Sequence, residues 1–439
     1  MRARWLLVGL VLMAALGKPA AADASEKAIW GPVTLPNGNS AFPTYQDLGV
    51  DTVQFTLNWR SIAPERPADP GNPADPAYAW PQEVDSAVAQ AGPAGINVAL
   101  LVIGSPGWTN GGQSALHAPD PAAYATFMAA ASRRYPSVRR WMVWGEPNRA
   151  DRFLPNEANS PVGARAYATI LDAAYGALKA VSAQNIVIGG MTWTGGDVRP
   201  AAFMEYMRLP NGKPPRLDWF GHNPFPFRFP NLREIPVAGG YRDLSDLDTF
   251  SRQLRKTYGK RVRFWLSEFL VLSDRGSEQF ELSVSRAEQA RWLAAAYRIA
   301  DSLPSVAGLG WLALQDQPQR PGSSNWGLLT DAGSRKPAYD AFRAASGERF
   351  RPEVEVARRV PARVVSKRGL AVRVTPVAGG RVSVELRRGS RVVARGTRVG
   401  RPGAPKKLRL RASGVARGSY TCIVRVPRGA TVRRQVQVR

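Results

Sequence analysis

Two glutamates each lie in an apolar run that has the composition of a buried strand. Glu146 ends the run RWMVWGE at residues 140–146, and Pro147 directly after it stops the strand from continuing. Glu268 lies within the run FWLSEFL at residues 264–270. A buried carboxylate is costly unless it is paired or protonated. Two such carboxylates in one cleft can break a glycosidic bond, because one protonates the leaving oxygen while the other attacks the anomeric carbon or activates water.

A repeated pattern of elements surrounds these two residues. From about residue 28 to residue 347 the chain alternates short apolar strands with amphipathic helices. Some strands are apolar on both faces, such as NVALLVI at 97–103, which is typical of a buried parallel sheet. The candidate strands begin near Ala28, Asp51, Ile96, Arg139, Asn185, Leu217, Val262 and Ala307, and candidate helices cover Pro81–Ala91, Pro121–Tyr135, Gly163–Val181 and Arg286–Leu303.

Eight such units predict an α/β fold, a (β/α)₈ TIM barrel whose active site lies at the carboxyl ends of its strands. Glu146 and Glu268 then end the fourth and seventh strands and face one cleft. An open doubly wound sheet is the alternative, although no glycine-rich phosphate loop follows the first strand. Each glutamate also has a structural interpretation: Glu146 could cap the next helix, and Glu268 could satisfy a buried arginine.

The ordered series of motifs in this region resembles a retaining glycoside hydrolase of the clan that includes the cellulase-like families and family 39, the β-xylosidase and iduronidase group. The resemblance covers roughly residues 29–344. It implies that Glu146 is the acid/base, that Glu268 is the nucleophile, and that configuration is retained. The motifs are YAW at 78–80, Asp85, SPGW at 105–108, WGEPN at 144–148, HNPF at 222–225, LSEF at 266–269, and GLL at 327–329 followed by KPAY at 336–339.

The sequence departs from that family at two positions. The family usually has asparagine before the acid/base, where it helps to bind the 2-hydroxyl of the sugar, and this chain has Gly145. The family also usually has an arginine within the second strand, and this chain aligns Gln54 there. These departures imply that the substrate is held differently, that specificity has diverged, or that activity is lost.

Further candidate substrate-binding residues follow the strands. His222 and Asn223 close the sixth strand, where the resemblance places a residue near the nucleophile, although a backbone-satisfied histidine is an alternative. Tryptophan supplies a flat apolar partner for sugars. Trp311 falls at the eighth strand, where the family has a platform beneath the cleaved sugar, and Trp59 and Trp108 follow other strands. For tryptophans as a class, a place in the core is the commoner alternative.

The amino-terminal segment is expected to be a secretory signal. Residues 1–24 hold basic residues, an apolar run of about 13 residues at 5–17 and a small-residue stretch, with cleavage expected after Ala22 or Ala24. The apolar run is shorter than the roughly 20 residues that span a membrane, so the mature chain is not expected to be transmembrane. We therefore expect a secreted protein. One cysteine, Cys422, excludes an internal disulfide, and with only two histidines no transition-metal centre or cofactor is expected.

The carboxyl-terminal part is a different module. Residues 351–439 hold 24 Lys and Arg against 3 Asp and Glu, whereas the other 350 residues hold 36 against 31. Short alternating strands separated by glycine-rich turns predict a small immunoglobulin-like all-β sandwich. We expect the barrel over residues 25–347, a linker over 348–360 and the sandwich over 361–439. Its charge could contact an anionic polymer or cell surface, or it could be a solvated face; no nucleic-acid motif is visible.

These features favour a secreted glycosidase that acts on β-linked oligo- or polysaccharides. Two other classes stay open. One is a catalytically silent barrel that binds carbohydrate, and the other is a wall-associated or anionic-surface adhesion protein in which the basic module carries the function.

Overall fold

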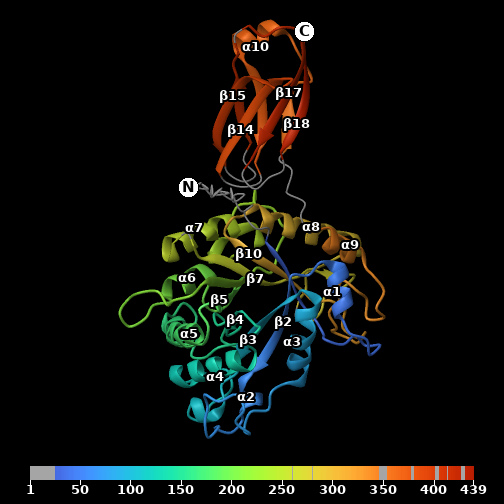
Figure 1. The fold of residues 1–439 in the computed structure, drawn as a ribbon. Coiled ribbons are helices and arrows are strands. Elements are labelled where there is room, and N and C mark those ends of the chain that lie inside the picture. Colours follow the sequence, from blue (N-terminus) through green and yellow to red (C-terminus); the bar gives the residue numbers. More distant parts are fainter. Residues whose placement is uncertain are drawn as a thin grey trace, which may run out of the picture.

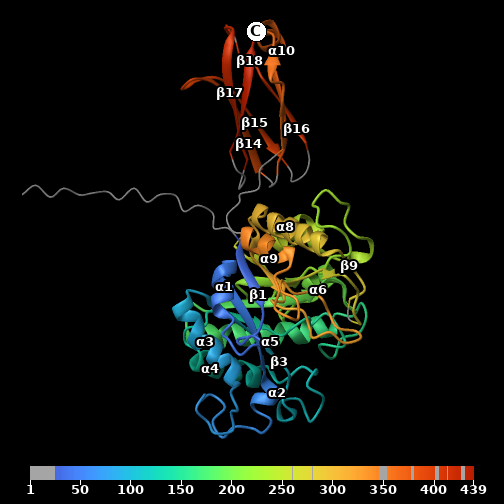
Figure 2. The same cartoon turned by 90° about the vertical axis from the view of Figure 1, so that its right-hand side faces the viewer.

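The computed structural model describes residues 25–439 apart from residues 260, 279, 346–352, 377–379, 401–404, 413 and 427–430. The expected signal segment, residues 1–24, lies outside the described residues. In the views of Figures 1 and 2 a barrel surrounded by helices and an all-β domain form two separate bodies.

The barrel consists of eight parallel strands that close in the order β1-β10-β7-β6-β5-β4-β3-β2. Every strand begins within two residues of its expected start, so the (β/α)₈ barrel is confirmed. The strands are β1 Glu26–Trp30, β2 Thr52–Asn58, β3 Asn97–Ile103, β4 Arg140–Val143, β5 Ile186–Trp193, β6 Trp219–Asn223, β7 Arg263–Phe269 and β10 Val306–Leu312.

Helices connect successive strands and cover the barrel (Figure 1). Their starts carry ordinary helix signals. Asp120 caps α4 by accepting from the Ala123 amide, and Ser285 and Glu288 form a reciprocal capping box at α8. The helices are α1 Phe42–Leu48, α2 Trp59–Ile62, α3 Gln82–Ala94, α4 Pro121–Arg134, α5 Val162–Val181, α6 Pro200–Tyr206, α7 Leu247–Tyr258, α8 Arg286–Ser302 and α9 Pro337–Ala344, with 3₁₀ turns at Gly107–Thr109, Ala238–Gly240 and Leu244–Asp246.

Strand alternation divides the apolar side chains of the barrel into two layers. One set fills the interior, where Leu101, Met142 and Trp265 pack together. The other set points outward and joins the helices in a larger cluster that includes Trp311. Which of two neighbouring strand residues faces inward therefore decides which one can reach the site.

The all-β domain contains two sheets, which confirms the predicted sandwich. One has the order β11-β13-β16 and the other β12-β18-β17-β14-β15. The elements are β11 Glu353–Val356, β12 Arg359–Val360, α10 Ala362–Arg368, β13 Leu370–Thr375, β14 Gly380–Arg388, β15 Arg391–Gly400, β16 Lys406–Leu410, β17 Gly418–Arg425 and β18 Val432–Val438.

The domain begins before the expected boundary at residue 361. β11 pairs with β13 and β12 pairs with β18, so residues 353–360 of the expected linker belong to the sandwich. Its core is one apolar cluster that includes Cys422. Among the helices of the described residues, none is long and apolar enough to cross a membrane.

Candidate active site

A cavity of about 330 Å³ opens at the carboxyl ends of the barrel strands, and both Glu146 and Glu268 line it. The structure thus brings together the two carboxylates that the sequence singled out. Polar groups from β2, β6 and the loop after β4 join them, and apolar side chains form the remaining wall. The other lining residues are Asn58, Leu101, Ile103, Gly104, Ala115, Leu116, Trp144, Gly145, Arg149, Arg152, Met191, Asn223, Phe225, Phe280, Leu312 and Trp326.

Glu146 lies in a sharp turn directly after β4. Its φ is 50° and that of Trp144 is 60°, a left-handed conformation that side chains other than glycine seldom adopt. The Glu146 amide donates to the Met191 carbonyl at 2.9 Å, and the Trp144 amide donates to the Val102 carbonyl at 3.1 Å. These bonds hold the strained turn and aim the Glu146 carboxyl group into the cavity.

The Glu146 carboxylate is held by three neighbours. Arg149 Nη1 donates to Oε2 at 2.8 Å, and Arg152 Nε lies 3.8 Å from the same oxygen. Asn223 Nδ2 donates to Oε1 at 3.0 Å. Asn223 Oδ1 accepts from the Ser267 hydroxyl at 2.6 Å, so Asn223 links Glu146 to the strand of Glu268.

Asn148, two residues after Glu146, fixes the loop that carries it. It is fully buried, and its Nδ2 lies within hydrogen-bond distance of the carbonyls of Trp193, Gly195 and Val198. Its Oδ1 accepts from the Trp193 amide at 2.8 Å. Asn148 therefore joins the loops after β4 and β5.

Glu268 has different surroundings at the end of β7. Within the described residues its carboxyl group forms no hydrogen bond or ion pair. Burial, and then the negative charge of Glu146, raise the pKa of Glu268 to about 8. Gln54 does not reach it, because Nε2 of Gln54 donates to the Ser267 carbonyl and Oε1 accepts from Trp265 Nε1.

The raised pKa favours the protonated form of Glu268 at neutral pH, while the Glu146 carboxylate lies in an ion pair with Arg149. The two carboxyl groups can therefore share the proton of Glu268. Two carboxyl groups that face one cavity and share a proton can act together on a glycosidic bond. One can donate a proton to the leaving oxygen, and the other can act as nucleophile or base.

Trp326 and Phe280 are aromatic residues of the wall that the sequence analysis missed, and contacts with distant parts of the chain position Trp326. Backbone hydrogen bonds hold its loop at three successive residues. The Asn325 carbonyl accepts from the Ser273 amide, the Trp326 carbonyl accepts from Trp311 Nε1 at 3.0 Å, and the Gly327 amide donates to Asp316 Oδ1 at 2.6 Å.

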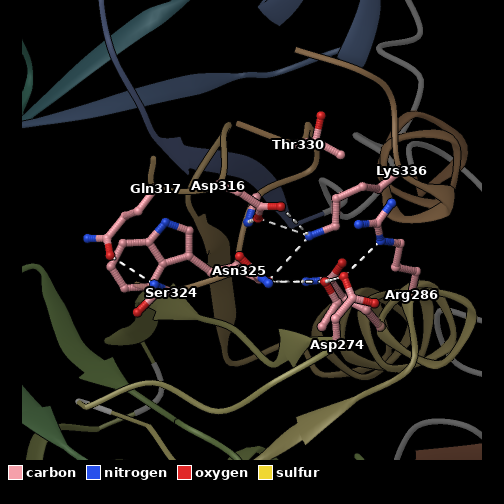
Figure 3. A network of polar contacts seen from close by, with 12 residues as sticks. Asp274, Arg286, Asp316, Gln317, Ser324, Asn325, Thr330 and Lys336 are labelled. Atoms are coloured by element: carbon pink, nitrogen blue, oxygen red, sulfur yellow. Dashed lines mark hydrogen bonds and ion pairs between the residues drawn. The ribbon is translucent and has the colours of Figure 1, made fainter. Parts of the chain in front are cut away.

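A buried ion pair supports this loop (Figure 3). Lys336 Nζ donates to Asp316 Oδ1 at 3.0 Å and to the Asn325 carbonyl at 3.3 Å, and both charged side chains are almost fully buried. Lys336 begins the KPAY motif and Gly327 begins the GLL motif. These two motifs, which carried part of the family resemblance, thus meet through Asp316 and position Trp326.

Three of the expected binding residues do not line the cavity. His222, Trp311 and Trp59 are fully buried outside the cavity, whereas their neighbours Asn223, Leu312 and Asn58 line it. Alternation places Trp311 on the outer face of β10 with Leu309, and Trp59 begins α2 beneath Trp108.

His222 fits the backbone-satisfied alternative. Its Nε2 donates to the Arg242 carbonyl, and its Nδ1 lies 2.9 Å from the Thr192 hydroxyl. Burial lowers its pKa to about 4, so it is neutral at pH 7. Trp108 also lies outside the cavity wall, with Nε1 donating to the Ala63 carbonyl at 3.0 Å. Asn223 is the expected binding residue that reaches the site.

Arg149 and Arg152 were also missed, although both follow Glu146 within six residues. Basic residues this close to an acid on a loop are a signal that a sequence analysis could use. Among the described residues, no group of three or more His, Cys, Asp or Glu side chains is arranged to hold a metal ion.

No protein family profile matches the sequence, and no curated protein sequence matches it significantly. Solved structures do match. A family 39 glycoside hydrolase from Bacteroides cellulosilyticus WH2 aligns with a TM-score of 0.56 at 14% identity, over 89% of this chain and 81% of that chain. A monomeric β-xylosidase from Caulobacter crescentus CB15 aligns with a TM-score of 0.52 at 14% identity, over 94% of each.

A family 39 β-xylosidase from Caulobacter crescentus aligns with a TM-score of 0.51 at 16% identity, over 83% of each chain. At these identities the likeness concerns the fold. The chain has the fold of family 39 glycoside hydrolases, which agrees with the resemblance carried by its motifs.

Proposed function

We propose that this protein is a glycoside hydrolase that cleaves β-linked sugars with retention of configuration. The observation that carries the proposal is the pair of carboxylates, Glu146 after β4 and Glu268 at the end of β7, which face one cavity. The fold shared with family 39 glycoside hydrolases supports the same assignment. We assign Glu146 as the acid/base and Glu268 as the nucleophile.

The first step requires the shared proton on Glu146. The bridging oxygen of a bound glycoside accepts a hydrogen bond, which favours the proton on Glu146 and leaves Glu268 ionised. The Glu268 carboxylate attacks the anomeric carbon while Glu146 gives its proton to the departing oxygen. Arg149 and Asn223, both bonded to Glu146, then stabilise the carboxylate that this transfer leaves.

The second step uses the same groups in reverse. Glu146 takes a proton from water as the water oxygen attacks the anomeric carbon, and the bond to Glu268 breaks. Two inversions at one carbon give overall retention. Trp326 and Leu312 supply an apolar wall for the C–H face of a sugar, and Asn58 and Asn223 supply polar groups.

The rest of the proposal concerns where the enzyme acts. The amino-terminal segment supports secretion, and the charge of the all-β domain supports contact with an anionic polymer or cell surface. The substrate is then an oligo- or polysaccharide outside the cell.

A silent carbohydrate-binding barrel is the second candidate. Two observations favour it: Gly145 has no side-chain amide to offer a sugar hydroxyl, and among the described residues Glu268 forms no ion pair that would keep it ionised. A protein of this kind would bind sugars without turnover.

Chemical rescue separates the two candidates and tests the two roles. Glu268→Ala and Glu146→Ala should each lower turnover of an activated aryl β-glycoside by on the order of 10³-fold or more. Added azide should rescue both variants. It should give a glycosyl azide of inverted configuration with Glu268→Ala, and one of retained configuration with Glu146→Ala.

Glu157→Gln changes an exposed glutamate outside the cavity wall and serves as the matched control, with turnover expected to be unchanged. Wild-type protein that binds glycosides without cleaving them would favour the silent barrel. A retained azide from Glu268→Ala together with an inverted azide from Glu146→Ala would reverse the assigned roles.

A further inference from the structure

The all-β domain carries a groove of its own, with a volume of about 900 Å³. It lies where the two sheets approach each other through β11 and β18. Residues of β13 and β16 extend its floor from the neighbouring strands of the smaller sheet. The lining residues are Val354, Glu355, Val356, Ala357, Arg358, Ala371, Arg373, Lys407, Arg433, Arg434 and Gln435.

Five of these lining side chains are basic and one is acidic. The single acid, Glu355, lies 3.7 Å from Arg373, and strand pairing places Lys407 directly opposite Arg373 on the other side. Among the described residues, the side chains of Arg358, Lys407 and Arg433 form no ion pair, and all three are exposed. The groove therefore concentrates positive charge that the described residues only partly neutralise.

On β14 one acid serves several basic groups, because Glu385 lies within salt-bridge distance of Arg387, Arg395 and Arg425. Exposed arginines without an ion pair among the described residues also occur elsewhere on the domain, such as Arg391 and Arg398 on β15. The groove differs in gathering five basic side chains in one hollow.

We propose that this groove binds a linear polysaccharide that carries carboxylate groups. Guanidinium groups pair with carboxylates through two parallel hydrogen bonds, and neighbouring strands set such groups about 4.8 Å apart. An extended chain with repeated carboxylates can contact several of them at once. Binding in the groove does not depend on the proposed function. Only the further idea that the barrel cleaves the bound polymer rests on it.

The composition of the domain argues against two other partners. Neutral polysaccharides and single-stranded nucleic acids need exposed aromatic rings on which sugars or bases stack. Tyr420 is the only aromatic residue from 351 to 439, and it is buried with its hydroxyl donating to the Ala416 carbonyl. Recognition in this groove must therefore come from charge and hydrogen bonding.

Binding of the full chain to polygalacturonate tests the proposal. Glu268→Gln is the background, so that polymer cannot be cut during the measurement. Arg358→Gln with Arg433→Gln removes two of the unpartnered groove charges. Since each exposed contact contributes modestly, affinity should fall roughly five- to tenfold. The matched control, Arg391→Gln with Arg398→Gln, removes the same charge from exposed positions on β15, at the opposite edge of the sheet from β12 and β18.

The control pair should change affinity by less than about twofold. Dextran, double-stranded DNA at equal charge concentration and phosphatidylglycerol vesicles complete the comparison, with circular dichroism to confirm folding of each variant. Equal losses in the two pairs would overturn the proposal, because binding would then depend on net charge alone. Tighter binding to DNA or vesicles would also overturn it. The readout is independent of turnover, so it stands or fails separately from the proposed glycosidase.

Discussion

Glu268 differs from Glu146 in the charges around its carboxyl group. Glu146 has Arg149 at 2.8 Å, whereas Glu268 lies among buried groups with no basic partner in the described part of the chain. The resemblance to family 39 implies an arginine at position 54, and this chain has Gln54 there. Gln54 instead ties the backbone of β7 to Trp265.

The shared proton gives a direct expectation for the pH dependence of turnover. The pKa of Glu268 is raised to about 8, so below that pH the pair holds a proton for the leaving oxygen. As pH rises through about 8 Glu268 loses this proton, and kcat/KM should fall. Arg149 lowers the pKa of Glu268, so Arg149→Met should move this fall to higher pH.

The measurement is kcat/KM against pH with an aryl glycoside. Arg165→Met, an exposed change on α5, is the control and should leave the profile in place. A kcat/KM that stays constant from about pH 6 to 10 would show that no shared proton of this kind limits turnover.

Among individual residues, the sequence predicts the two catalytic carboxylates better than the side chains that surround them in the cavity. Glu146 and Glu268 are recognisable because a carboxylate in an apolar strand is unusual. The contacting residues depend on which face of a strand end points inward. There the sequence analysis named both His222 and Asn223, of which Asn223 reaches the cavity, and it named Trp311 where Leu312 reaches it. Alternation alone could have placed Trp311 with Leu309 on the outer face.

Elements were more predictable than loops. The eight strands follow from apolar runs of the right length, and helix ends follow from caps such as Ser285 with Glu288. The loop that carries Trp326 has no such periodic signal. Its course depends on contacts with residues distant in the chain, including Ser273 and Lys336.

We expect the ion pair of Lys336 and Asp316 to hold this loop. Lys336→Met leaves a buried carboxylate without its partner, so the free energy of unfolding should fall by about 3–5 kcal/mol. The loop should also shift, and the fluorescence of Trp326 should change with it. Denaturant unfolding and the emission difference between wild type and Trp326→Phe measure the two effects.

Introducing Lys336→Met into the Trp326→Phe background provides the control. The change in stability should persist there, while the change in emission should be largely lost. A loss below about 1 kcal/mol in both backgrounds would mean that the pair does not support the loop.

The whole molecule joins a barrel that is close to neutral to a strongly basic all-β domain. Charge predicted this division, because 24 of the 60 basic residues and only 3 of the 34 acidic ones follow residue 350. The start of the sandwich at β11 was missed, since a four-residue strand with two glutamates resembles a linker until it pairs with β13. In the proposed enzyme the domain holds an anionic polymer and the barrel cleaves a glycan.

The central claim is that Glu146 and Glu268 cleave a glycosidic bond with retention. The most direct test is proton NMR of the reaction mixture during hydrolysis of a panel of aryl β-glycosides. The account predicts that the first sugar released has the β configuration, before mutarotation adds the α anomer. Initial release of the α anomer would show inversion and contradict the double displacement, and a panel that is bound but left intact would contradict the enzyme itself.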